Sequence, residues 1–310
     1  MHDAKSRWLP CHDGFGLKQS RNMTVTHSNE SGDDVAQGPL RVFWRHVFVV
    51  TAFLALGACT TTEITDSVQV DKAQGSESNI ASLTAVVERN PNSAEAYNVR
   101  GTAYGLAEQA REAIADFSRA IELNPRFYKA YANRALVYRS INEQEAAVAD
   151  YTKAIQINSQ YDEAYIGRGN VYRLAGQDDR AFRDFERAIQ IGSTNPRAYH
   201  SRGLIFQKRG QHNQAIEDFS TAISLEPAAA EPYNSRGVSY LASGDKENAL
   251  EDINRALRLN DRYAEAWANQ GLVYEQNGNN KKAFKSYAHA AQLDNKLEIA
   301  SQGMARTRGS

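Results

Sequence analysis

Residues 94–127, AEAYNVRGTAYGLAEQAREAIADFSRAIELNPRF, and residues 128–161, YKAYANRALVYRSINEQEAAVADYTKAIQINSQY, share one pattern of small and aromatic residues. The pattern occurs six times in succession with a constant period of 34 residues. Two alanines, at positions 20 and 27, recur in every copy: Ala113, Ala147, Ala181, Ala215, Ala249 and Ala283, then Ala120, Ala154, Ala188, Ala222, Ala256 and Ala290. Self-similarity at a period of roughly 20 to 50 residues indicates stacked units, because no unit can bury its apolar face alone.

Each copy has further residue types at fixed positions, counted from its first residue (Ala94, Tyr128, Asp162, Pro196, Ala230 or Ala264). Positions 4 and 11 are aromatic, position 8 is glycine or alanine, and position 24 is aromatic in all copies but one. Apolar residues spaced by three or four predict two short amphipathic helices per copy, named helix A and helix B here. Position 15 separates them with residue types that close a helix in the left-handed conformation. These are Asn142, Gly176, Gly210, Gly244 and Gly278, with Glu108 in the first copy.

This arrangement resembles the tetratricopeptide repeat (TPR) family, over residues 94–297 and without an insertion. The resemblance implies an all-α fold, a right-handed α-solenoid of six TPR helix-turn-helix units with helical caps. The late proline of the family is present only at Pro125 and Pro227. Stacked arrays of this kind present an extended concave surface, so the resemblance also implies a binding protein.

Both ends of the array are predicted to be caps. Residues 79–93 contain one lone helix, which is either a capping helix or half of a preceding repeat, since Leu83 and Pro91 lie where its positions 24 and 32 would be. Residues 298–310 are predicted to form a C-terminal capping helix and a polar tail. Terminal repeats are expected to be atypical because one of their faces meets water.

A short apolar segment near the N-terminus has the features of an export signal. Arg41 and Arg45 precede a ten-residue apolar run, Val47 to Leu56. That run is too short to cross a bilayer as a helix, and a basic flank before a short apolar core is typical of a signal peptide. It ends in the tetrapeptide LGAC at residues 56–59, which resembles the bacterial lipobox. The resemblance implies cleavage before Cys59 and lipidation of its thiol; the alternative is an ordinary signal peptide with an incidental cysteine.

These features predict the organisation of the first part of the chain. Residues 1–58 are an extension plus a signal peptide that is removed, and residues 59–78 are the lipidated cysteine and a polar, flexible tether. The start is either Met1 or Met23. Thr60, rather than an aspartate, follows the cysteine. By resemblance to enteric lipoproteins this favours the outer membrane, with the array facing the periplasm and held to the membrane only by its lipid.

Two charged positions change together among the six copies. Position 7 is arginine and position 23 is aspartate in the first five copies: Arg100 and Asp116, Arg134 and Asp150, Arg168 and Asp184, Arg202 and Asp218, Arg236 and Asp252. In the sixth copy they become Gln270 and Ser286. This predicts structural ion pairs between helix A and helix B, within a unit or to the next one, because a guanidinium can hold a carboxylate with two hydrogen bonds. The alternative is a row of arginines that binds an acidic ligand.

In TPR arrays helix A lines the concave face, and the resemblance implies that positions 2, 5, 6, 9, 12 and 13 are exposed there. The candidate partner-binding residues at these positions are Asn98, Lys129, Asn133, Arg139, Asn170, Arg173, His200, Gln207, Lys208, Asn234 and Asn269. Asparagine amides suit peptide backbones because they both donate and accept. Arg139 and Arg173 share position 12 of neighbouring units, so with Lys129 they are predicted to form a basic spot for a carboxylate or an acidic peptide. The alternative is that all of these are ordinary solvated side chains.

Several function classes are disfavoured. The net charge is −1 and the repeats contain no basic stripe, so we expect no nucleic-acid partner. The two cysteines, Cys11 and Cys59, lie outside the repeats, and the three histidines inside them are scattered in sequence. No phosphate-binding loop, G-x-S-x-G or H-E-x-x-H motif is present. We therefore expect no enzyme, no cofactor and no metal site.

The sequence thus predicts a membrane-tethered periplasmic adaptor that docks a protein or peptide partner, in cell-envelope assembly or in regulation of cell-wall enzymes or proteases. Two other classes stay open: a pilotin-like accessory factor for secretion or pilus biogenesis, and a component of polysaccharide export. A fold does not separate such functions. A homodimer formed by exchange of the lone N-terminal helix is a further alternative.

Overall fold

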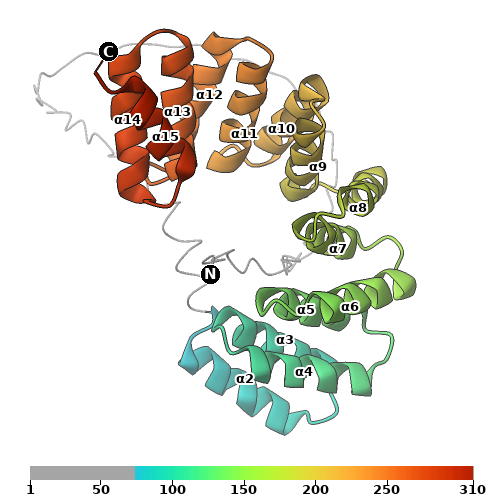
Figure 1. Ribbon diagram of the computed structural model, residues 1–310. Coiled ribbons are helices and arrows are strands. Elements are labelled where there is room, and N and C mark those ends of the chain that lie inside the picture. The colour runs from blue at the N-terminus through green and yellow to red at the C-terminus, as the bar shows by residue number, and fades with distance from the viewer. Residues whose placement is uncertain (1–73, 310) are drawn as a thin grey trace, which may run out of the picture. The chain divides into compact units, whose positions relative to one another are not determined.

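The computed structural model describes residues 74–309, and this part of the chain forms fourteen α-helices (Figure 1). The helices are α2 (Glu77–Arg89), α3 (Ala94–Leu106), α4 (Ala110–Leu123), α5 (Tyr128–Ser140), α6 (Gln144–Ile157), α7 (Asp162–Leu174), α8 (Asp178–Gln190), α9 (Pro196–Lys208), α10 (His212–Leu225), α11 (Ala230–Ala242), α12 (Lys246–Leu259), α13 (Ala264–Gln276), α14 (Asn280–Leu293) and α15 (Glu298–Thr307). The expected all-α solenoid is confirmed, and each of the six units begins at its predicted first residue. The predicted signal peptide, Cys59 and most of the tether lie outside the described residues.

The helices pack in sequence order. Each helix A (α3, α5, α7, α9, α11 and α13) contacts the helix B that follows it, and that helix B contacts the next helix A. Neighbouring helices A also contact one another, whereas no two helices B within residues 74–309 do. The helices A therefore lie on the inner side of the stack, so the faces they leave uncovered are adjacent from unit to unit.

The turn between helix A and helix B depends on position 15. Gly176, Gly210, Gly244 and Gly278 have φ between 71° and 84°, the left-handed region where a side chain is strained. Asn142 and Glu108 adopt the same conformation, with φ of 66° and 59°. The turn is thus kept in all six units, even where the first unit has no glycine or asparagine.

The core is formed by the small and aromatic positions of the repeat. The twelve alanines at positions 20 and 27 are fully buried. A methyl group added to Gly101 would lie 2.9 Å from the ring of Phe117, and Gly169 and Gly203 stand in the same relation to Phe185 and Phe219. Glycine at position 8 therefore makes room for the ring at position 24, because interiors are too closely packed to absorb another carbon.

Two units use a tyrosine at position 24, and each is followed by a glycine at position 6 of the next helix A. A methyl group on Gly167 would lie 2.3 Å from the Tyr151 ring, and one on Gly303 would lie 2.4 Å from the Tyr287 ring. Gly303 belongs to α15, whose Ala300 and Thr307 are buried like positions 3 and 10 of a helix A. The C-terminal cap is therefore the first helix of a seventh repeat.

The caps differ slightly from their predicted limits. Helix α2 begins at Glu77, two residues earlier than predicted, because the Ser76 hydroxyl accepts a hydrogen bond from the backbone N–H of Asn79 and caps the helix there. At the other end, Arg306 of α15 holds Glu275 of α13 through Nε at 2.7 Å and Nη2 at 2.9 Å. Among the helices of residues 74–309, none combines the length and apolarity that a membrane crossing needs.

Candidate functional site

The arginines at position 7 are held inside the fold. In each of the first five units the arginine Nε and Nη2 donate to the two carboxylate oxygens of the aspartate at position 23 of the same unit, at 2.7–2.9 Å. The pair therefore joins helix A to helix B within a unit. Both side chains are largely buried, and hydrogen bonding to Asp116 raises the pKa of the Arg100 guanidinium.

The same arginines also join successive units, which the sequence did not reveal. Nη1 donates to a hydroxyl at position 25 of the preceding helix B. These contacts are Arg134 to Ser118 at 2.8 Å, Arg168 to Thr152 at 3.0 Å and Arg236 to Ser220 at 2.9 Å. Aromatic rings at positions 4 and 11 flank the guanidinium, as Tyr97 and Tyr104 flank Arg100 at 5.7 Å. Arg134, Arg168 and Arg236 thus have protein partners for Nε, Nη1 and Nη2 and a ring on both sides.

The sixth unit keeps this connection with neutral groups. Ser286 donates to Gln270 Oε1 at 2.6 Å, and Gln270 Nε2 donates to Asn254 Oδ1 of the preceding helix B at 2.7 Å. The simultaneous change of both positions thus replaces a charged set of hydrogen-bonded residues with a neutral one. It leaves the packing of α13 on α14 and α12 in the same form.

The asparagines on the inner face bond to one another across units. Asn133 donates to Asn98 at 3.1 Å, and Asn269 donates to Asn234 at 2.9 Å. In both cases position 6 of one unit meets position 5 of the unit before it. Ser201 donates to Asn170 at 3.2 Å, so this amide too has an internal partner. A peptide bound here would have to share these amides with the contacts between helices A.

On the inner face, the side chain at position 12 can contact the next helix A. Gln207 donates to the backbone oxygen of Ser235 and to the Ser239 hydroxyl, both at 2.8 Å. Arg173, at the same position one unit earlier, is different: its Nε is buried and has no hydrogen-bond partner among the described residues. Burial lowers the pKa of the Arg173 guanidinium, Asp178 raises it in part, and Arg139 lowers it further. The two arginines at position 12 therefore lie close enough to repel each other.

Lys129, also predicted for this spot, and Lys208, another predicted partner-binding residue, have different surroundings. Lys129 lies ten residues before Arg139 on α5, which places it about 15 Å away along the helix axis. It already takes part in an interaction within the protein. Lys208 is paired with Asp178. Arg139 and Arg173 therefore share one level of the neighbouring helices A, whereas Lys129 lies near the other end of α5.

His200 lies next to this pair but is uncharged at neutral pH. Burial, and then the charge of Arg173, lower its pKa to about 4. Its Nε2 is 3.2 Å from the Ser235 hydroxyl, and its ring lies 5.5 Å from that of Phe219. The neutral ring connects α9 to α11, in the same way as the asparagines connect their helices.

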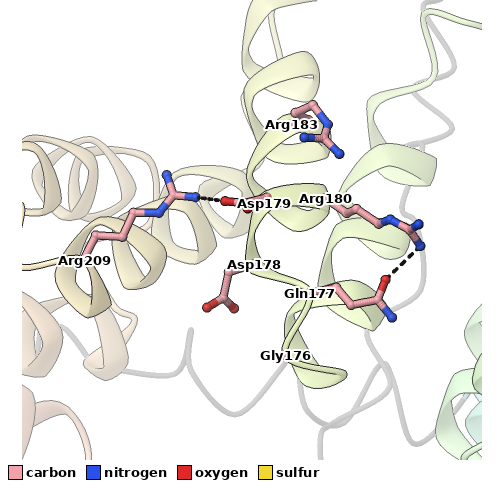
Figure 2. Close-up of a pocket in the computed structure, with 7 residues that line it drawn as sticks. All are labelled: Gly176, Gln177, Asp178, Asp179, Arg180, Arg183 and Arg209. Atoms are coloured by element: carbon pink, nitrogen blue, oxygen red, sulfur yellow. Dashed lines mark hydrogen bonds and ion pairs between the residues drawn. The ribbon is translucent and has the colours of Figure 1, made fainter.

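A polar cleft of about 670 Å³ adjoins this region at the junction of the third and fourth units (Figure 2). It is lined by Gly176, Gln177, Asp178, Asp179, Arg180, Arg183 and Arg209. Figure 2 shows the Arg209 guanidinium directed at Asp179, at 2.6 Å, and that of Arg180 directed at Gln177, at 2.9 Å. Asp178 belongs to the cleft and also acts on Arg173, so the cleft and the arginine pair are adjacent. The dense charge of residues 178–187, DDRAFRDFER, is the sequence signal that marks it.

The described residues do not bring three His, Cys, Asp or Glu side chains together in a group that could hold a metal ion. The group that is unusual here is the guanidinium of Arg173, which has a buried Nε without a partner among the described residues and Arg139 close by. Guanidiniums bind carboxylates and phosphates through paired N–H donors. The arrangement is therefore suited to holding an anionic ligand.

Comparison with protein families gives matches along most of the array. A family model described as TPR repeat matches residues 135–176, 169–210 and 203–244, and two models described as tetratricopeptide repeat match residues 94–127 and 234–298. Together these matches cover more than half of the chain. A comparison with curated protein sequences gives no significant match.

Solved structures share the fold. The chain from the APC/C hetero-tetramer Cut9–Hcn1 has a TM-score of 0.69 at 18% identity; the match covers 78% of this chain and 48% of that one, so this chain spans about half of its length. PilF of Pseudomonas aeruginosa has a TM-score of 0.62 at 17% identity, with 69% and 97% covered. YrrB, described as a TPR protein with an unusual peptide-binding site, has a TM-score of 0.51 at 28% identity, with 61% and 97% covered. With six matching units in register, the chain belongs to the tetratricopeptide repeat family.

Proposed function

We propose that this protein is a membrane-tethered adaptor that docks a protein partner on the inner face of its helices A. The observation that supports this most strongly is the pair Arg139 and Arg173. Five other arginines of the array have an aspartate partner, whereas Arg173 has a buried donor without one among the described residues. Burying a charge without a partner is unfavourable for folding, so its retention is more readily explained by binding.

The general role agrees with the family, because TPR arrays act as protein-interaction scaffolds. YrrB, whose match covers 61% of this chain, is described as having a peptide-binding site. A peptide on this inner face would run across several units, since neighbouring helices A contact each other along the whole stack. The proposed partner is therefore an extended segment of another protein.

The tether is proposed from the sequence alone. Arg41, Arg45 and the apolar run before Cys59 support export, and the LGAC tetrapeptide supports lipidation at Cys59. An exported lipoprotein with Thr60 after the cysteine would be held at the outer membrane and face the periplasm. Cys59→Ser should release the protein into the soluble fraction, whereas Cys11→Ser should leave it membrane-bound. Tight membrane association of the Cys59→Ser protein would refute the lipid anchor.

The adaptor role is tested by crosslinking in cells followed by mass spectrometry. The wild-type chain is compared with an Arg139→Ala/Arg173→Ala variant and with a matched control, Arg111→Ala/Arg258→Ala, whose arginines are exposed on helices B. We expect the control to keep the wild-type partners and the inner-face variant to lose at least one. If the wild-type protein captures no envelope protein above background, the adaptor proposal is wrong. The captured proteins would also separate cell-wall regulation from secretion, pilus or polysaccharide-export roles.

A further inference from the structure

The ligand chemistry of the inner face can be read from position 12. At two units this side chain binds a group on the next helix A. Gln207 donates to Ser239 at 2.8 Å, and Glu275 accepts from Arg306 at 2.7 Å. In these two of the six units a polar side chain at position 12 bridges consecutive helices A, whereas Gly105 and Leu241 at this position have no polar side chain.

The side chains opposite Arg139 and Arg173 are different. The residues that correspond to Ser235 and Ser239 are Gly167 and Val171 opposite Arg139, and Ser201 and Ile205 opposite Arg173. Gly167, Val171 and Ile205 offer no side-chain acceptor, and the Ser201 hydroxyl donates to Asn170 at 3.2 Å. The buried Arg173 Nε has no hydrogen-bond partner among the described residues.

Nearby charges compensate for the two arginines only in part. Asp178 is the carboxylate that acts on Arg173, but it is already paired with Lys208. The adjacent His200, whose ring lies between Ser235 and Phe219, is neutral and adds no negative charge. The pair therefore presents an excess of positive charge in a half-buried place, where an ionic hydrogen bond is stronger than in water.

We propose that Arg139 and Arg173 together bind one carboxylate of a peptide partner. This carboxylate takes the place of an acceptor from the next helix A. This rests on the proposed adaptor function and names the chemistry that the partner must supply. A carboxylate fits better than a phosphate because Asp178 and Asp179 lie beside the site and repel a dianion more strongly than a monoanion. The five Arg–Asp pairs of the same array show the geometry that such a contact would have.

The carboxylate is supplied either by an acidic side chain or by the C-terminus of the partner, and the test separates the two. The probe is a fluorescein-labelled short peptide of alternating Asp and Glu, with its C-terminus free or amidated. A peptide of alternating Asn and Gln, with the same two termini, removes the acidic side chains. Binding to the full chain in detergent is followed by fluorescence anisotropy at low and at moderate salt.

We expect the acidic peptide to bind and its affinity to fall with salt. Arg173→Ala should weaken binding by roughly tenfold or more, and Arg139→Ala by a similar factor, because each removes a charge-assisted hydrogen bond. Arg111→Ala should leave the affinity unchanged. If only peptides with a free C-terminus bind, the C-terminal carboxylate is the group recognised; if amidation has no effect, acidic side chains are.

Three results would overturn the inference: equal affinity for the acidic peptide with a free C-terminus and for the amidated Asn/Gln peptide, which has no carboxylate; unchanged affinity in Arg173→Ala; or tighter binding of a phosphoserine peptide that has no carboxylate. None of them would by itself remove the adaptor function, because crosslinking would still capture partners of the wild-type chain. The converse result is tight binding of the acidic peptide to a protein that captures no partner in cells. That result would support the carboxylate site and reject the adaptor proposal.

Discussion

Arg168 and Asp184 form a two-point ion pair inside the third repeat, with Nε and Nη2 of the arginine 2.9 Å and 2.8 Å from the carboxylate oxygens. Arg173, five residues later on the same helix, has a buried Nε without a partner among the described residues. One helix therefore carries an arginine paired within the stack and an arginine that we propose for ligand binding. The two should respond to substitution in opposite ways.

Arg168→Ala should destabilise the array by roughly 3–5 kcal/mol, because it leaves the carboxylate of Asp184 buried without its counterion. It also removes the donor to Thr152 that joins the second unit to the third. The measurement is the free energy of unfolding from chemical denaturation, together with the melting temperature. Arg168→Gln/Asp184→Ser, which copies Gln270 and Ser286 of the sixth unit, should recover much of the loss. An unchanged melting temperature in Arg168→Ala would show that the ion pair does not stabilise the fold.

Gly167→Ala should cost roughly 1–3 kcal/mol through overpacking, because the new methyl group would lie 2.3 Å from the Tyr151 ring. The second unit has Ala135 at position 8, where most units have the glycine that makes room for this ring. Ala135→Gly/Tyr151→Phe should therefore restore the usual packing and make Gly167→Ala tolerable. Calorimetric melting of wild type, Gly167→Ala, Ala135→Gly/Tyr151→Phe and the triple variant checks this. If Gly167→Ala lowers the stability equally in both backgrounds, the ring at position 24 does not determine the need for glycine at position 167.

Glu108→Gly should stabilise the protein by about 1 kcal/mol, since Glu108 has φ of 59° and a side chain is strained there. Glycine adopts this conformation without strain and is what four of the other five units use. Glu108→Ala is the matched control, because it removes the charge but keeps the strain. A rise in melting temperature of equal size for both variants would mean that the charge, and not the backbone, is responsible.

Stability should fall as the pH drops from about 6.5 towards 4, in part because of His200. Its pKa is about 4 in the folded protein and near 6.5 when unfolded, so below pH 6.5 the unfolded chain takes up a proton that the folded chain does not. The stabilisation is fully present above pH 6.5 and is lost at up to about 1.4 kcal/mol per pH unit below it. His200→Gln, which keeps a donor for Ser235, should make the profile of unfolding free energy against pH flatter in this window. An identical profile would show that His200 is not buried in its neutral form.

Much of the fold could be predicted from the sequence because its determinants repeat. The alanines at positions 20 and 27 and the residues at position 15 recur at a fixed period, so the helices, their turns and their first residues follow directly. The pairing of position 7 with position 23 is visible because both change together at Gln270 and Ser286. These relations lie inside one unit. The six copies of the unit can therefore be compared with one another, as homologous sequences would be.

Relations between units are harder to predict. The bond from Asn133 to Asn98 joins position 6 to position 5 of the unit before, and no single copy of the repeat contains both partners. The same holds for Tyr151 and Gly167, whose sizes match only across a unit boundary. Charge alone groups Lys129 with Arg139, although ten helical residues separate them. Whether two such residues lie side by side depends on their positions along the helix axes, and a residue pattern does not show these positions.

The assignment of Arg173 to partner binding is tested most sharply by the melting temperature of the full-length wild-type chain and of Arg173→Ala, each with and without the acidic peptide. A ligand that binds only the folded state raises the melting temperature. We expect wild type to melt higher when the peptide is added. We also expect Arg173→Ala to start at an equal or higher temperature, because no hydrogen bond to Nε is lost, and not to respond to the peptide. A variant that melts lower than wild type and is still stabilised by the peptide would contradict the assignment.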